Sequence, residues 1–297
     1  MIDYPTDRPI VEQAEKLALD ETVLVRDLVR VVEVLNLKQE GFFNKESVLA
    51  GSMALRCFES PRFTVYDADF STSSDTVRPE TKMRDLLSYM DDELEIVPAA
   101  LVPHDDRGTA WESAPIEYRP TFTALVPGAN DRTFKADVSF RGLVLPGIET
   151  PLLVPYDLGI WPDPPTVFVM DPHEIVAEKI LGWCVNRGVK HYADLAYIAL
   201  ISRPEADPQL IELDYGKARD VTAEKLDRMS GIQPNKYASF TSVDGLIGDL
   251  AKPAQFDSKQ WIRLMYLRAQ RDRFKPAYIE AAVRGILAEG LRRAGPH

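Results

Sequence analysis

Cysteine and long apolar runs are both scarce in this 297-residue sequence. The two cysteines, Cys57 and Cys184, lack the spacing of a metal site, so we expect two buried thiols and a reducing compartment. The longest apolar runs, such as residues 152–154, are far too short to cross a bilayer. The N-terminus also lacks the basic start and apolar stretch of a signal peptide. These absences predict a cytoplasmic protein that has no membrane partner.

A positive net charge is also lacking, since 46 acidic residues outnumber 35 basic ones and the formal net charge is −11. This balance argues against nonspecific coating of nucleic acid, because such affinity comes from many phosphate contacts. Residues 255–297 are an exception, because basic side chains outnumber acidic ones there and are interleaved with aromatic ones. That segment can follow a phosphate backbone or stack on a base, or it is a helix with a charged solvent face.

The arrangement of apolar residues predicts a mixed α/β fold of the α+β class. Hydrophobic residues make up 45% and charged residues 27% of the chain, the balance of an ordinary globular protein. We expect a mixed domain over residues 1–195, followed by a helical domain over residues 196–297. The expected helices cover residues 10–37, residues 81–90 and much of the chain from residue 194 onward, and the expected strands cover residues 47–50, 63–70, 94–97, 116–125, 134–140 and 166–169.

A helix from about residue 171 to about residue 186 has the clearest start signals in the sequence. Asp171 suits the N-cap, Pro172 suits the first helical position, and Glu174 has the spacing of a capping box. Lys179 lies among mostly apolar neighbours in this helix. It therefore either extends to solvent or serves a site.

The segment Asp67-Ala68-Asp69 is the central observation. On a strand, residues two apart point to the same face, so these two carboxylates lie side by side and repel each other. A divalent cation relieves that repulsion, and Mg²⁺ bound to carboxylates keeps positions for water and nucleotide phosphate. The alternative is a pair of solvated carboxylates on an edge strand.

Two further features support a nucleotide site. Gly51-Ser52 follows a short apolar strand and opens a helix, where backbone N–H groups and a hydroxyl suit a phosphate. Asp137 lies on another strand-like segment and can act as a third metal ligand or accept a proton. The alternatives are an ordinary turn at Gly51-Ser52 and a surface alternation of lysine and aspartate around Asp137.

Taken in order, these motifs resemble the AbiEii-type nucleotidyltransferases, which include the mycobacterial MenT toxins. The resemblance implies the DNA polymerase beta-like nucleotidyltransferase core with a helical C-terminal domain. Two positions depart from the family's pattern: many relatives have glycine at Ser52, and they often have aspartate at His191. The matches are residues 49–55 and 62–70 for the first motif, Lys135 and Asp137 for the second, Lys179 for the third, and Arg187, Lys190 and Asp194 for the fourth.

The resemblance implies roles for the matched residues. Lys179 would bind the triphosphate and stabilise charge on the leaving group. Asp194 would orient Lys179, orient the acceptor or act as a base. The implied metal ligands for Mg²⁺ are Asp67, Asp69 and Asp137, and the implied NTP-binding residues are Gly51, Ser52, Arg62, Lys135, Arg187 and Lys190.

Plainer interpretations of the basic residues stay open at this point. Arg187 and Lys190 can instead pair with Asp194 and Glu178, and Arg62 can be an ordinary surface charge. A single histidine such as His191, which we expect on a loop, is more often solvated than functional.

The resemblance also implies an activity, the transfer of a nucleoside monophosphate from an NTP to the 3′ end of tRNA, which blocks translation. It further implies a cognate antitoxin as a partner. One alternative acceptor is a protein hydroxyl or a cationic small molecule, which the acidic net charge would attract. A noncatalytic binding module is the other alternative.

Overall fold

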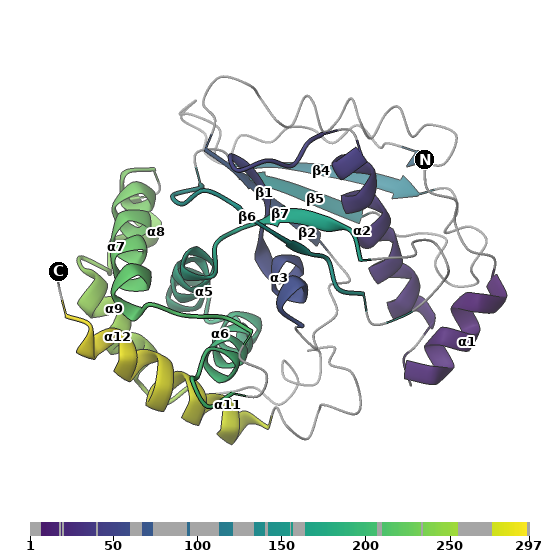
Figure 1. The fold of residues 1–297 in the computed structure, drawn as a ribbon. Helices are drawn as coiled ribbons and strands as arrows, with labels where there is room; N and C mark the ends of the chain where they lie inside the picture. The colour runs from purple at the N-terminus through teal and green to yellow at the C-terminus, as the bar shows by residue number, and fades with distance from the viewer. Residues whose placement is uncertain are drawn as a thin grey trace. The chain divides into compact units, whose positions relative to one another are not determined.

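The chain divides into two compact units. The structure is a computed structural model that describes residues 7–17, 19, 21–39, 41–59, 67–73, 94–95, 113–120, 134–139, 142–154, 156, 164–206, 210–232, 234–254 and 275–295. One unit comprises Met1–Cys57 with Pro61–Met170, and the other comprises Phe58–Ser60 with Asp171–His297. The units thus divide at residue 170, and the functional boundary at residue 195 stays a prediction. Strands occur in the first unit and helices form the described part of the second (Figure 1), which confirms the mixed α/β fold.

Seven strands, counted over the described residues of the first unit, form one mixed sheet in the order β3-β4-β5-β2-β1-β7-β6. The central strand β2 is antiparallel to β1 and parallel to β5, and β1 is parallel to β7. The pairs β3–β4, β4–β5 and β6–β7 are antiparallel. The strands are β1 (Ser47–Leu49), β2 (Asp67–Thr72), β3 (Leu94–Glu95), β4 (Ser113–Pro120), β5 (Phe134–Ser139), β6 (Ile148–Pro151) and β7 (Thr166–Val169).

Each predicted strand has a counterpart, and β7 has the predicted bounds. β4 begins at Ser113 rather than at residue 116. β6 was not predicted, because it is a short edge strand that follows Gly147 and ends at Pro151, two residues that indicate turns. The predicted helix over residues 81–90 lies outside the described residues, as do residues 63–66 and 121–125 of two predicted strands.

The single helix predicted over residues 10–37 is wrong, because two helices occupy that segment. α1 covers Asp7–Leu17 and α2 covers Glu21–Gln39. The N–H of Leu19 donates to the carbonyl of Ala14 at 2.9 Å and closes α1. Periodicity missed the break because apolar residues recur at helical spacing on both sides of it.

The apolar face of α2 is buried at Leu24, Leu28, Val31 and Leu35. The helix ends in a Schellman motif, in which the N–H groups of Gly41 and Phe42 donate to the carbonyls of Lys38 and Leu37, both at 2.9 Å. Gly41 has a φ of 72°, which glycine adopts without steric cost. The chain then enters the core, where the Phe42 ring meets the Phe70 ring of β2 at 5.6 Å.

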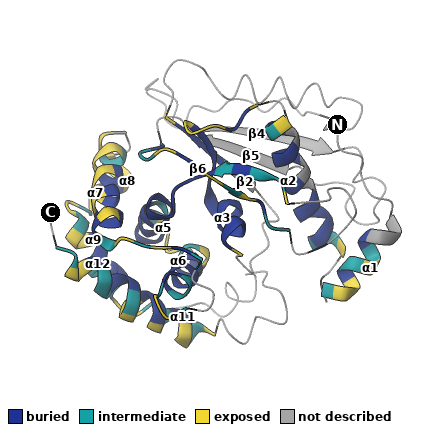
Figure 2. Ribbon diagram, in the orientation of Figure 1, coloured by how far each residue is buried: buried dark blue, intermediate teal, exposed yellow. Residues whose placement is uncertain are grey.

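In the second unit, α5 is the central helix and packs against α6, α7 and α9. Most of its residues are buried (Figure 2), which its apolar composition on all sides explains. α6 begins at Val189, so the start predicted at residue 194 was too late. The helices are α5 (Pro172–Asn186), α6 (Val189–Ile201), α7 (Tyr215–Ile232), α8 (Pro234–Tyr237), α9 (Val243–Leu250), α11 (Pro276–Ala282), the π-helical η4 (Val283–Ala288) and α12 (Glu289–Arg293).

Both cysteines are buried free thiols, as predicted. Burial raises the pKa of Cys57 to about 12 and that of Cys184 to about 12, so neither is a thiolate at neutral pH. None of the helices in the described ranges is both long and apolar enough to cross a membrane.

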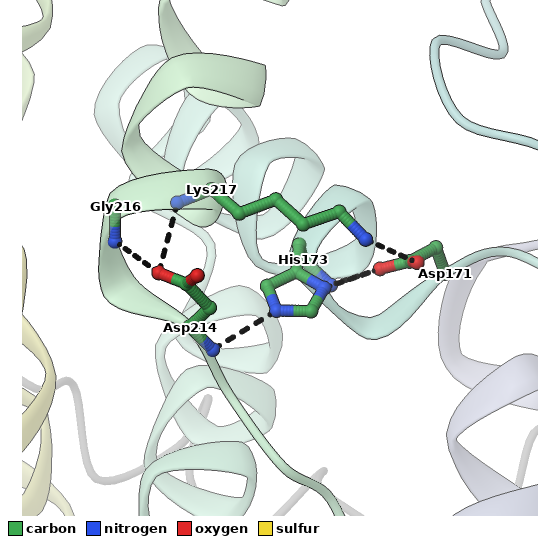
Figure 3. A network of polar contacts seen from close by, with 5 residues as sticks. All are labelled: Asp171, His173, Asp214, Gly216 and Lys217. Atoms are coloured by element: carbon green, nitrogen blue, oxygen red, sulfur yellow. Dashed lines mark hydrogen bonds and ion pairs between the residues drawn. The ribbon is translucent and has the colours of Figure 1, made fainter. Parts of the chain in front are cut away.

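The start of α5 is fixed by a polar network that joins it to the start of α7 (Figure 3). Asp171 is the N-cap of α5, as predicted, and its carboxylate accepts from the backbone N–H of His173 at 2.9 Å. The same carboxylate lies 2.6 Å from Nδ1 of His173 and 3.0 Å from Nζ of Lys217 on α7. Glu174, predicted to complete a capping box, forms an ion pair with Lys225 at 2.9 Å.

His173 links the two helix starts through its two ring nitrogens. The backbone N–H of Asp214 donates to Nε2 of His173 at 3.0 Å, so Nε2 is an acceptor and Nδ1 carries the proton that faces Asp171. Asp214 in turn caps α7, because its carboxylate accepts from the backbone N–H groups of Gly216 and Lys217. The first turns of α5 and α7 are therefore held in register.

Burial alone would raise the pKa of Asp171, but hydrogen bonds from His173 and Lys217 lower it to about 2. Because the pKa falls on folding, the charge stabilises the fold above pH 4 or so and ceases to do so as the pH falls toward about 2. Asp171→Asn keeps a good N-cap but removes the charge. We expect it to lower the free energy of unfolding by about 2 kcal/mol at pH 7.

Urea unfolding from pH 7 down to pH 3 measures this effect, and the difference between variant and wild type should shrink as the pH falls. Asp220→Asn, at an exposed position of α7, is the matched control and should have little effect at any pH. A loss for Asp171→Asn that stays constant over the pH range would contradict the assignment.

Candidate active site

Gly51 brings the turn after β1 against the Asp69 carboxylate. α3 (Gly51–Ala54) starts at this turn, and Gly51 has a φ of 63°. A Cβ atom at position 51 would lie 1.8 Å from Oδ2 of Asp69, well inside van der Waals contact. The backbone N–H of Ala50 also donates to the Asp69 carbonyl at 2.8 Å. Conformation and space therefore both require glycine here.

The register of the central strands places the predicted acidic positions together. Asp69 of β2 is paired with Asp137 of β5, and Asp67 is paired with Lys135. Paired positions share a face of a sheet, as do positions two apart on one strand. Positions 67, 69 and 137 therefore lie on one face. Ala68, which points to the opposite face, is buried in the core, whereas Asp69 is only partly buried.

This face suits a divalent cation of the Mg²⁺ type. Carboxylate oxygens are the hard donors that Mg²⁺ prefers, and acids at neighbouring positions repel each other unless a cation is present. The side chains of Asp67, Lys135 and Asp137 lie outside the described residues, as does all of Arg62. Among the described side chains, no group of three or more potential metal ligands gathers.

Sequence reasoning missed a buried ion pair that anchors the segment after α3. η1 (Leu55–Phe58) follows α3 directly, and Arg56 of η1 forms an ion pair with Asp27 of α2. The hydroxyl of Tyr156 donates to the other Asp27 oxygen at 2.8 Å. Burial favours a lower pKa for Arg56, but Asp27 and Tyr156 reverse that effect and the pKa is raised. A sequence signal existed, because Asp27 interrupts an apolar part of α2.

Lys179 does not extend to solvent, since Nζ lies 2.9 Å from Oδ2 of Asp194 on α6. Their side chains are 7% and 3% exposed, so each charge depends on the other. Of the roles considered for Asp194, this contact favours the one that orients the Lys179 ammonium.

Ser52 is buried in α3, and Arg187 and Lys190 lie where α5 gives way to α6. Arg187 ends α5 with a φ of 51° and pairs with Asp249 at 2.6 Å, not with Asp194 or Glu178 as sequence reasoning allowed. Glu178 instead pairs with Lys225 at 2.8 Å. Arg187 remains 51% exposed and Lys190 is exposed, so both can still meet a ligand.

His191 lies on α6 rather than on a loop, which corrects the expectation from the sequence. Its side chain is partly buried and faces Gly182 and Gly188. Position 191 is therefore part of the packing between α5 and α6.

A comparison with protein families finds a match over most of the chain. The family model described as "Nucleotidyl transferase AbiEii toxin, Type IV TA system" matches residues 37–272. That range includes each candidate site residue considered above. No curated protein sequence matches the chain.

Several solved structures are similar to this chain. MenT4, a nucleotidyltransferase toxin from Mycobacterium tuberculosis, is 18% identical with a TM-score of 0.55, and the match covers 97% of this chain and 91% of MenT4. JHP933 from Helicobacter pylori is 15% identical with a TM-score of 0.42, and the match covers 93% of this chain and 95% of that one. At these identities the likeness concerns the fold alone, and MenT4, with a TM-score of 0.55, supports a shared fold.

Gly51→Ala and Gly41→Ala separate the effect of space from that of conformation. Both glycines have positive φ, but a Cβ at position 41 would meet nothing within 4 Å. We expect Gly41→Ala to lower the free energy of unfolding by about 1–2 kcal/mol, the conformational cost alone. Gly51→Ala should lose clearly more, because the Asp69 carboxylate must also move. Equal losses in urea unfolding would refute the contact between Gly51 and Asp69.

Asp194→Ala should lower the free energy of unfolding by about 3–5 kcal/mol, because it leaves the Lys179 ammonium buried without its partner. The double variant Lys179→Met/Asp194→Leu removes both charges and should recover most of that loss. Glu224→Ala, which breaks an exposed ion pair with Arg228 on α7, should cost less than about 1 kcal/mol. If the double variant is as unstable as Asp194→Ala in urea unfolding, the ion pair is not what stabilises this position.

Proposed function

We propose that this chain, which belongs to the AbiEii nucleotidyltransferase toxin family, transfers a nucleoside monophosphate from an NTP to the 3′ end of tRNA and so blocks translation. The observation that carries the chemistry is the Asp69 carboxylate, which touches the Gly51 turn and whose position is in register with Asp137. Neither a surface strand nor an ordinary turn needs such a close approach between a carboxylate and a glycine.

Asp67, Asp69 and Asp137 would hold Mg²⁺. When bound, the metal would neutralise the negative charge of the triphosphate. The turn at Gly51-Ser52 would supply backbone N–H groups and a hydroxyl to a phosphate. Gly51 lets that backbone approach, since a side chain there would strike Asp69. Arg62 and Lys135 would add positive charge for the NTP.

Lys179 would bind the triphosphate and stabilise the charge that develops on the leaving group. Asp194 fixes the direction of the ammonium through the 2.9 Å ion pair. A lysine held this way loses little conformational freedom when it binds its ligand. Preorganised charges lower a reaction barrier because they need no rearrangement during the reaction. Arg187 and Lys190 would bind the tail of the NTP or the acceptor.

The choice of RNA as the acceptor rests on the family and on the basic residues of segment 255–297. A basic segment can bind a phosphodiester backbone although the net charge of the chain is negative, because contacts with phosphate are local. A toxin of this family also implies a cognate antitoxin that restrains it, and the cytoplasm is where tRNA and NTPs would be available.

Transfer of label from each of four α-labelled NTPs to total tRNA, with Mg²⁺ present, tests the proposal. We expect one or more NTPs to label tRNA at its 3′ end. Asp69→Asn should reduce the rate by about a thousand-fold or more, the scale for loss of a group that organises transition-state charge. Asp220→Asn, a change at an exposed aspartate of α7, should keep the wild-type rate.

The molecule that becomes labelled distinguishes the proposal from its alternatives. Label that appears on protein or on a cationic small molecule would contradict the RNA acceptor but preserve the transferase. An absence of transfer to any acceptor, together with no NTP binding in calorimetry, would leave a noncatalytic module and overturn the proposal.

A further inference from the structure

Helices α5 and α6 form an antiparallel hairpin whose contacts follow a regular order. The ion pair joins Lys179 to Asp194, and one turn further along α5 the backbone at Gly182 meets the His191 ring. The rings of Trp183 and Tyr192 lie beside that contact, with centroids 4.5 Å apart. The Gly182–His191 contact is therefore the neighbour of the buried ion pair along the same helix–helix interface.

Two glycines make room for the His191 ring. A Cβ at Gly182 would lie 2.8 Å from Cε1 and 2.9 Å from Nδ1 of His191, and a Cβ at Gly188 would lie 3.1 Å from Cδ2. A glycine inside a helix costs roughly 1 kcal/mol relative to alanine. At Gly182 that cost has a physical reason, since any side chain there would push the ring and α6 away from α5.

We propose that His191 is a positioning residue that sets the location of the Lys179 ammonium. Its ring acts as a spacer of fixed thickness between α5 and α6, one turn from the ion pair. That spacing decides how Nζ of Lys179 meets the Asp194 carboxylate. AbiEii-type relatives often have aspartate at this position. In this chain the imidazole ring of His191 fills the space between the two helices. The catalytic consequence rests on the proposed role of Lys179, but the positioning does not.

Trace acetylation with acetic anhydride, followed by peptide mass spectrometry, tests the positioning without any nucleotide. His191→Ala should raise the labelling rate of Lys179 by about five-fold or more, because the loosened hairpin opens more often. Lys225 is the internal control, since it is also a buried lysine of this unit and pairs with Glu174 and Glu178 at 2.9 and 2.8 Å. Its labelling should not change. An unchanged Lys179 rate, or an equal rise at Lys225, would overturn the proposal.

A double-mutant cycle identifies the ring as the cause. In the wild-type background, Gly182→Ala should increase Lys179 labelling and lower the Tm. In the His191→Ala background the added methyl group has room, so Gly182→Ala should reduce Lys179 labelling relative to His191→Ala alone. Gly248→Ala in α9 is the matched control, because a Cβ there meets nothing within 4 Å. It should leave Lys179 labelling unchanged and raise the Tm slightly, since alanine is favoured over glycine in a helix. If Gly182→Ala has the same effect in both backgrounds, the ring does not set the spacing.

Kinetics supply a readout that a purely structural residue would not move. In the tRNA labelling assay at a temperature where the variant is folded, His191→Ala should lower kcat by about ten-fold with little change in KM for the NTP, because a displaced ammonium stabilises the leaving group less well. An unchanged kcat would overturn the catalytic consequence. If the wild type transfers nothing, the proposed function fails, and the labelling of Lys179 still decides the positioning.

Discussion

The contact between the Gly51 turn and the Asp69 carboxylate is the constraint on which the candidate site depends. A negative side chain is held against a backbone that has no room for a methyl group. β1 leads into the turn, β2 carries the acid, and the hydrogen bond from Ala50 to the Asp69 carbonyl holds the two together. The pairing of β2 with β5 then adds position 137 to the same face. Three acidic positions share this face, with Lys135 paired to Asp67. Carboxylates at such positions repel one another unless a cation is present, which is why we interpret them as ligands for a cation.

In the second unit a positive charge is buried and is paired within the protein. Lys179 lies in a helix that is buried on nearly all sides, so its ammonium cannot be solvated and depends on Asp194. Around that pair, the second unit fixes α5 at its start through Asp171 and His173, and along its length through Lys225 and the His191 ring. A cation preorganised by its surroundings needs no rearrangement when a phosphate arrives, which is the property expected of a group that stabilises transition-state charge.

Local patterns predicted much of this molecule, and long-range contacts account for what they missed. The bounds of β7, the N-cap at Asp171 and the shared face of positions 67 and 69 follow from residue types a few positions apart. The register of Asp69 with Asp137, the partner Asp249 for Arg187 and the network of Asp27 with Arg56 join residues far apart in the sequence. No local periodicity encodes those pairings. The break between α1 and α2 was missed for a different reason, because the apolar spacing continues across it.

Binding of Mn²⁺ in place of Mg²⁺, followed by electron paramagnetic resonance in the absence of nucleotide, tests directly whether the acidic face exists to hold a cation. The wild type should bind Mn²⁺ saturably, and Asp69→Asn should weaken that binding by about ten-fold or more, the effect of removing one charged ligand. Replacement of Asp220, which is exposed on α7, should leave the binding curve unchanged. Identical binding curves for the wild type and Asp69→Asn would show that these acids are ordinary surface charges.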